Sequence, residues 1–98
     1  MFRITFDRRK RDRTLKERKL KFEDAAKVFQ GYTLDEIDAR LDYGEERWIT
    51  VGALRNKVVV IVWTPVDAET RRVISVRAAD GEEQENYWRR LAEEGPLD

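Results

Sequence analysis

The stretch Val58-Val59-Val60-Ile61-Val62-Trp63 decides the fold of this chain. A continuous apolar run rich in β-branched residues is typical of a strand that is buried on both faces. Such a strand needs a neighbouring strand on each side and a covering layer above and below. The run therefore predicts the centre of a sheet with helices packed against it.

The segments around this run supply the expected neighbours. They are strands at 1–6, 44–51 and 72–78, an ambiguous edge segment at 32–41, a hairpin turn at 53–56 and a loop at 64–70. Within 72–78, alternation places Val73, Ser75 and Arg77 on one face. Ile74 and Val76 then face the core.

Three segments have helical patterns. Residues 8–18 are almost free of apolar side chains and predict a surface helix, whereas residues 22–29 and 81–93 each carry an apolar stripe. The order predicts an α+β fold: a twisted antiparallel β-sheet with two N-terminal helices and one C-terminal helix packed on it. We expect one domain over residues 1–94 and a disordered tail at 95–98.

The charges balance overall but are unevenly distributed. The 98 residues include 20 Lys and Arg and 20 Asp and Glu, with no His and no Cys. Residues 1–22 carry ten bases against three acids, and residues 80–98 carry seven acids against two bases. This composition excludes disulfides, thiolate chemistry and a histidine base. No metal-ligand spacing, cofactor motif, membrane span or signal peptide is present, so we expect a cytoplasmic protein without a cofactor.

Arg77 is the first candidate site residue. It ends a strand just before a helix that opens at Asp80-Gly81-Glu82-Glu83, and a helix N-terminus can receive a phosphate. This placement suggests RNA chemistry carried out by arginine. The alternative is that Arg77 is a solvated residue paired with Glu83, and the sequence leaves both interpretations open.

The order of these segments resembles the BrnT family of ribonuclease toxins of type II toxin–antitoxin systems. The resemblance covers residues 5–88. It rests on Phe6-Asp7-Arg8-Arg9-Lys10, Phe22-Glu23-Asp24-Ala25-Ala26-Lys27-Val28-Phe29, Gly44-Glu45-Glu46-Arg47-Trp48-Ile49-Thr50-Val51-Gly52, the strand from Val58 to Thr64, and Ile74-Ser75-Val76-Arg77-Ala78-Ala79 followed by Glu83 and Tyr87. It implies a RelE-like fold and a metal-independent endoribonuclease that inhibits translation.

The family's partners follow from the same resemblance. It implies a cognate antitoxin that binds DNA, so that operator DNA is contacted only through the antitoxin, and it favours a homo- or hetero-oligomer. Three departures from the family pattern are clear, and one of them is Lys21, which stands where a Ser usually caps the second helix. Arg18 stands where the family usually has His, and acids at Asp80-Gly81-Glu82-Glu83 replace a basic run.

The resemblance and the chemistry of phosphate together predict the residues of an RNA-cleavage site. Arg47 and Arg77 are the expected charge stabilisers, because a guanidinium binds phosphate with a planar fork. Glu83 is the remaining candidate base or orienter. Arg11, Arg18 and Lys19 are the expected RNA contacts on the basic helix, which we expect to lie next to the Arg47 and Arg77 surface.

Each nomination has a structural alternative. Asp80 and Glu83 have the spacing of a capping box, and Arg47 can simply pair with a cross-strand acid. The charge run at 8–21 can be a solvated helix face. At the level of function, the alternative is a catalytically eroded RelE-like module that binds a partner protein or RNA without cleaving it.

Overall fold

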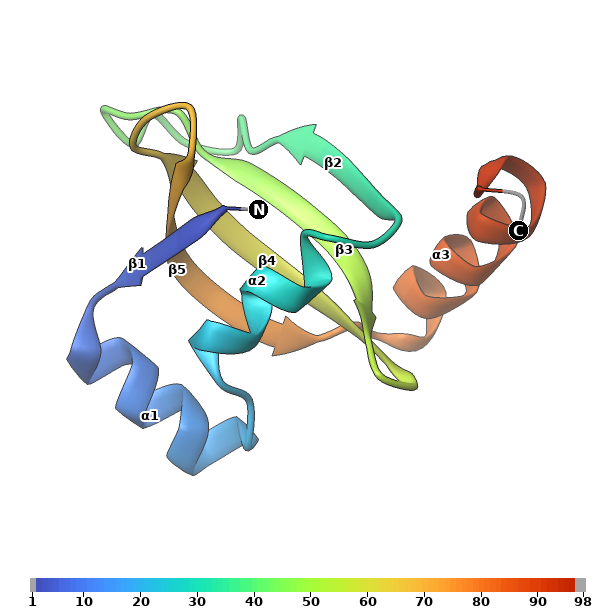
Figure 1. Ribbon diagram of the computed structural model, residues 1–98, viewed down its shortest axis with the longest axis horizontal. Helices are drawn as coiled ribbons and strands as arrows, with labels where there is room; N and C mark the ends of the chain where they lie inside the picture. Colours follow the sequence, from blue (N-terminus) through green and yellow to red (C-terminus); the bar gives the residue numbers. More distant parts are fainter. Residues whose placement is uncertain (1, 97–98) are drawn as a thin grey trace.

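A five-stranded sheet with helices on both faces forms the structure, a computed structural model that describes residues 2–96 (Figure 1). Its elements are β1 (Arg3–Phe6), α1 (Arg8–Arg18), the 3-10 helix η1 (Phe22–Asp24), α2 (Ala25–Val28), β2 (Thr33–Ile37), β3 (Trp48–Leu54), β4 (Lys57–Pro65), β5 (Thr70–Ala78) and α3 (Gly81–Glu94). Met1 of the predicted first strand and residues 97–98 of the predicted tail lie outside the described residues. None of the helices in the described part is long and apolar enough to cross a bilayer.

Strand β4 lies at the centre of the sheet, as the apolar run predicts. The strand order is β1-β5-β4-β3-β2. Val59 and Ile61 belong to the core cluster on one face, and Val58 and Val60 belong to the cluster on the other. The α+β class is therefore confirmed.

The sheet is mixed, so the prediction of an antiparallel sheet was wrong for one strand pair. β1 runs parallel to β5, with Arg3 opposite Thr70 and Phe6 opposite Val73. The other pairs are antiparallel. Only strands joined by a short turn must be antiparallel, and the chain between β1 and β5 is long enough for either direction. The RelE-like label stays a prediction.

The two faces have different covers. Phe22, Ala25 and Val28 of η1 and α2 pack with Val59 and Ile61 in the larger core cluster. We call this side of the sheet the α2 face. On the opposite side, the α3 face, Tyr87 packs with Val58 and Val60, and its hydroxyl donates to the Tyr32 carbonyl at 2.8 Å.

A β-bulge in β5 overturns the predicted alternation. Ser75 pairs with Val62 and Val73 pairs with Trp63, so Ile74 is left without a partner. The extra residue shifts the alternation by one position and so changes which side chains of β5 point to the α2 face. As a result Val73 and Val76 are both buried in the same cluster, whereas Ile74 is only half-buried.

Candidate functional site

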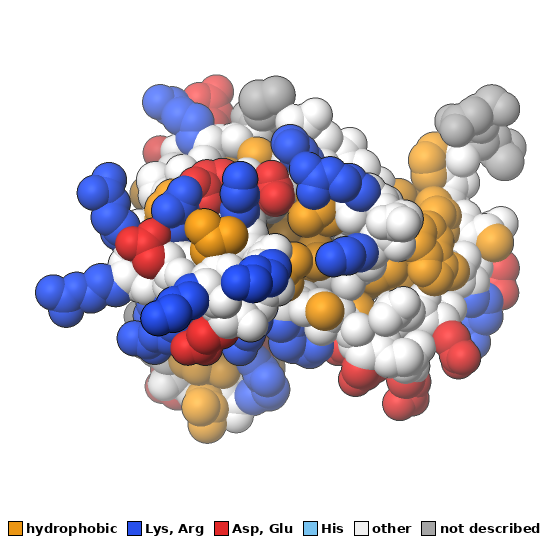
Figure 2. All heavy atoms as spheres, turned by 90° about the horizontal axis from the view of Figure 1, so that it is seen from below, with side chains coloured by type: hydrophobic (Ala, Val, Ile, Leu, Met, Phe, Trp, Pro, Cys, Tyr) orange, Lys and Arg blue, Asp and Glu red, His pale blue; other side chains and the backbone are white. Residues whose placement is uncertain are grey.

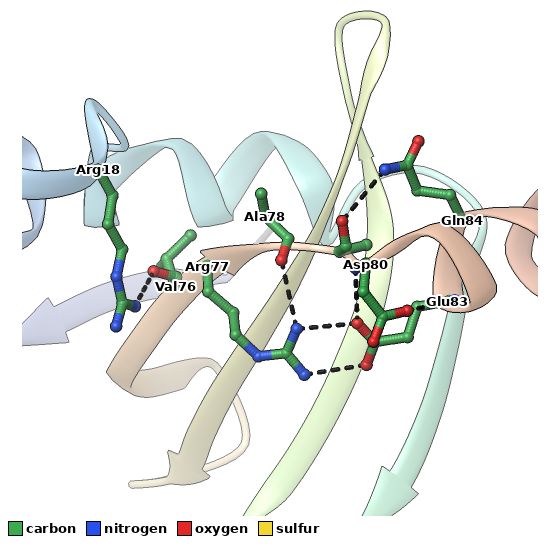
Figure 3. A network of polar contacts seen from close by, with 8 residues as sticks. Arg18, Val76, Arg77, Ala78, Asp80, Glu83 and Gln84 are labelled. Atoms are coloured by element: carbon green, nitrogen blue, oxygen red, sulfur yellow. Dashed lines mark hydrogen bonds and ion pairs between the residues drawn. The ribbon is translucent and has the colours of Figure 1, made fainter.

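Arg77 lies near the C-terminal end of β5 and faces α3, because it pairs with Val60 of the α3 face. Its Nη1 and Nη2 donate to the two carboxylate oxygens of Glu83 at 2.8 and 2.9 Å (Figure 3). Nη1 also donates to the Ala78 carbonyl at 3.2 Å. The ion pair that the sequence left open as an alternative is present.

Glu83 has a second contact that fixes its position. It forms a capping box with Asp80: each side chain accepts from the other residue's backbone N–H. The hydrogen bond from Arg77, together with the Asp80 N–H, lowers the pKa of Glu83 to about 2. A carboxylate with this pKa is a weak base near neutral pH. Of the two roles expected for Glu83, base or orienter, its contacts fit the second, because they hold the Arg77 guanidinium in one orientation.

One edge of the Arg77 guanidinium stays open. Glu83 occupies the Nη1/Nη2 end, and among residues 2–96 no acceptor meets Nε or the second N–H of Nη2. These two donors point along one side of the planar group and match two phosphate oxygens. Because 46% of the Arg77 side chain is exposed, a ligand can reach this edge without displacing Glu83.

Arg47 lies in a loop and not in a strand, because β3 begins at Trp48 and the predicted start at Gly44 was too early. Its Nε donates to Glu45 at 3.1 Å, and its Cζ lies 3.9 Å from the centre of the Tyr43 ring. The carboxylate partner is thus two residues away in the same loop and not across a strand pair. The structure gives Arg47 one ion pair and one aromatic neighbour.

Asp38 holds this loop in place. Its side chain is fully buried and accepts hydrogen bonds from Arg40 and from the Tyr43 hydroxyl. Its backbone N–H donates to the Arg47 carbonyl at 2.8 Å. The Arg40 hydrogen bond lowers the pKa of Asp38 to about 2. Sequence reasoning missed this role, for which only the short Asp38-x-Arg40 spacing gave a signal.

The structure does not bring Arg47 and Arg77 into contact. Arg77 is opposite Val60, whereas Arg47 precedes the residue opposite Trp63. These positions are at least three residues, or about 10 Å, apart along β4. They also lie on opposite sides of β4, which adds two strand spacings of about 5 Å each. Arg40 still has a weak effect on Arg77, whose pKa is raised chiefly by Glu83 and lowered slightly by Arg40.

The expected RNA contacts on α1 have different surroundings. Arg18 donates to the Val76 carbonyl at 2.9 Å, beyond the point where β1 stops pairing with β5, and so it lies beside Arg77 (Figure 3). Arg11 is occupied by Glu23, at 2.6 Å, and by Asp12, at 2.8 Å. Lys19 is exposed and ends α1 with φ 61°. Of the three, Arg18 is the one placed beside Arg77.

A metal site has no support in the described residues. Within residues 2–96, His, Cys, Asp and Glu side chains do not gather in the groups of three or more that could hold a metal ion.

Comparisons with known proteins identify the family of this chain and a solved structure with a similar fold. A family model described as "Ribonuclease toxin, BrnT, of type II toxin-antitoxin system" matches residues 6–83. Among solved structures, the crystal structure of the Brucella abortus ribonuclease toxin BrnT is similar, with a TM-score of 0.62 and 22% identity over 82% of this chain and 99% of that chain. No curated protein matches the chain. At this identity the structural likeness supports the fold, and the family match carries the argument about function.

Proposed function

Because this chain belongs to the BrnT family of ribonuclease toxins of type II toxin–antitoxin systems, we propose that it cleaves RNA in the cytoplasm and thereby inhibits translation. The proposal includes neutralisation by a cognate antitoxin. Toxin and antitoxin form a hetero-oligomeric complex, and the antitoxin is the component of this complex that contacts operator DNA. The observation that carries it is the open Nε/Nη2 edge of Arg77, fixed in direction by Glu83.

Arginine supplies the charge stabilisation in this proposal. When the 2′-oxygen of RNA attacks the neighbouring phosphorus, its proton passes to water. The bond from phosphorus to the 5′-oxygen breaks, the 5′-oxygen takes a proton from water, and a 2′,3′-cyclic phosphate is left. During this exchange negative charge grows on the non-bridging oxygens. Arg77 binds these oxygens through its open edge, and Arg18 and Arg47 hold other phosphates of the same RNA strand. Glu83 acts as a positioning residue for Arg77. Because arginine provides the positive charge, we expect the reaction to proceed without a metal ion.

A binding module without catalysis is the second candidate. Arg11, Arg47 and Arg77 each have a carboxylate partner, which lowers the positive field that an RNA phosphate would meet. A weaker positive field counts against cleavage, and so it favours the alternative of a module that binds a partner protein or RNA without cutting it. The two candidates differ in one measurable property, the breakage of RNA.

The first test is expression without an antitoxin, followed by cleavage of labelled RNA by purified protein in EDTA. We expect growth arrest, falling protein synthesis and RNA fragments. Intact RNA and normal growth would favour the binding module. Fragments that form only with added Mg²⁺ would contradict the arginine mechanism while leaving the toxin assignment in place.

The second test replaces Arg77. We expect Arg77→Ala to slow cleavage by on the order of a hundredfold, as loss of a preorganised donor does. Arg77→Lys should recover little of this, because an ammonium lacks the fork that meets two oxygens. Arg89→Ala is the control, since Arg89 is exposed on α3 and, within residues 2–96, its side chain bonds only Asn86. Equal rates for the Arg77→Ala and Arg89→Ala proteins would remove Arg77 from the site.

A further inference from the structure

Arg71 in β5 differs from the other half-buried arginines. Arg11, Arg47 and Arg90 each bind a carboxylate. Within residues 2–96, the side chain of Arg71 has neither an ion pair nor a hydrogen bond, although the chain has as many acids as bases. This arginine therefore has a charge that the described part of the chain does not neutralise by direct contact.

Three aromatic rings enclose the Arg71 guanidinium. Its Cζ lies 3.5 Å from the ring centre of Phe2, 3.9 Å from Trp63 and 4.5 Å from Phe29. The rings come from the segment before β1, from β4 and from the end of α2. Rings over the faces of a guanidinium attract it and hold its plane, yet they leave the N–H edges without acceptors. Sequence reasoning missed Arg71 because only the fold joins these three segments.

No carboxylate within the described residues contacts Arg71 to balance its charge. Burial lowers the pKa of Arg71, and Asp35 opposes this effect from a distance. The Asp35 carboxylate accepts from the hydroxyls of Thr50, at 2.6 Å, and Thr33, at 3.1 Å. No buried side-chain nitrogen in the described residues lacks a partner, so the Arg71 N–H groups reach solvent. A partly desolvated cation with open donors favours an anion from outside.

The neighbouring ring points to a nucleic acid and not to an acidic peptide. Trp48 stacks on Trp63 with centroids 6.0 Å apart and planes at 14°, and it is only half-buried. Trp63 thus lies between the Arg71 guanidinium and Trp48 on the same face of the sheet, and such a row of a cation and aromatic rings matches the phosphates and bases of a single strand. We propose that Arg71 binds a phosphate group of the RNA substrate at a subsite on the α2 face, with a base of the same strand near Trp48. This proposal rests on the proposed function for its substrate class.

The test uses RNA that the enzyme cannot cut. A 2′-O-methyl oligonucleotide lacks the attacking hydroxyl, so binding is measured apart from cleavage. We compare the full chain with Arg71→Met, which keeps an apolar stem over the rings, and with Arg89→Met, which loses the same charge on α3. Arg71→Met should weaken binding by on the order of tenfold and Arg89→Met far less. The slope of log affinity against log salt should become shallower by about 0.7 for Arg71→Met.

A second measurement needs no substitution. The Arg71 Nε–H signal of the wild-type protein is followed by NMR with inorganic phosphate, with the oligonucleotide and with a glutamate-rich peptide. Shifts with phosphate and oligonucleotide support the subsite. No shift, or a shift with the peptide alone, overturns it, and so does unchanged oligonucleotide affinity in Arg71→Met. If the wild-type protein binds through Arg71 but never cleaves RNA, the ribonuclease proposal fails and the subsite stands.

Discussion

The Arg77 guanidinium is shared between a protein carboxylate and solvent. An exposed ion pair usually adds little to stability, because it costs side-chain entropy and is screened by water. Here the pair is bidentate, and the Asp80 N–H holds the same carboxylate. Its main effect is to fix the direction of the remaining donors. A donor held in place before the ligand arrives loses less entropy when it binds.

This coupling gives a prediction at the scale of one carboxyl group. Glu83 should titrate with a pKa of about 2, and Arg77→Ala should raise that pKa towards the ordinary 4.5 because the largest cause of its depression is gone. The measurement is the carboxyl carbon shift of Glu83 against pH. A pKa near 4.5 in the wild-type protein would contradict the ion pair.

The lowered pKa of Glu83 also determines the direction in which the unfolding free energy changes with pH. Between these two pKa values the unfolded chain binds more protons than the folded one, so the contribution of the pair is complete above about pH 4.5 and is lost as pH falls towards 2. As pH falls from about 4.5 to 2, the unfolding free energy of the Arg77→Ala protein should therefore decrease less than that of the wild-type protein. Asp38 titrates in the same range in both proteins, so its effect cancels in the difference.

Among the elements, those with local signals were predictable. The apolar run gave β4, and the stripe through Tyr87 gave α3. The direction of β1 and the bulge at Ile74 depend on pairing between distant segments, which no local pattern encodes. The same holds for the site: the Arg77–Glu83 pair lies within seven residues of sequence and was one of the two interpretations that the sequence left open, whereas the enclosure of Arg71 was not expected.

The crossing of α2 over β3 gives a prediction at this scale. A Cβ on Gly52 would lie 2.5 Å from Cγ1 of Val28 and 3.2 Å from Cγ2 of Thr33. Val28 is buried and cannot move aside, so Gly52→Ala should lower the unfolding free energy by about 1–3 kcal/mol. Gly81→Ala is the control, because nothing lies within 4 Å of its Cβ position. Chemical denaturation compares them, and equal stability would mean that α2 does not approach this closely.

Over the whole molecule, charge is separated between the two ends. Lys and Arg side chains gather over the part that contains α1, and several acidic side chains lie on the part that contains α3 (Figure 2). Such a field steers an oppositely charged partner before contact and weakens as salt screens it. An antitoxin with acidic side chains would approach α1 first.

Arg8, Arg9 and Arg13 are the residues with which to test this steering. Their side chains are exposed and make no hydrogen bond or ion pair within residues 2–96, unlike the side chains of Arg11 and Arg18. Changing all three to Glu should slow association with the antitoxin at low salt and leave the dissociation rate nearly unchanged. The fold should lose little stability, because all three side chains are exposed and because negative charge at positions 8 and 9, in the first turn of α1, suits the helix dipole.

The control for the α1 variant reverses Arg55, Lys57 and Arg89, which are exposed and lie outside α1. It changes the net charge equally, so it separates a local docking field from overall charge. Association rates are measured against ionic strength for all three proteins. Slower association of the α1 variant alone, with the difference fading as salt rises, is the expected result. If the control slows association equally, the basic helix is a solvated face and the antitoxin docks elsewhere.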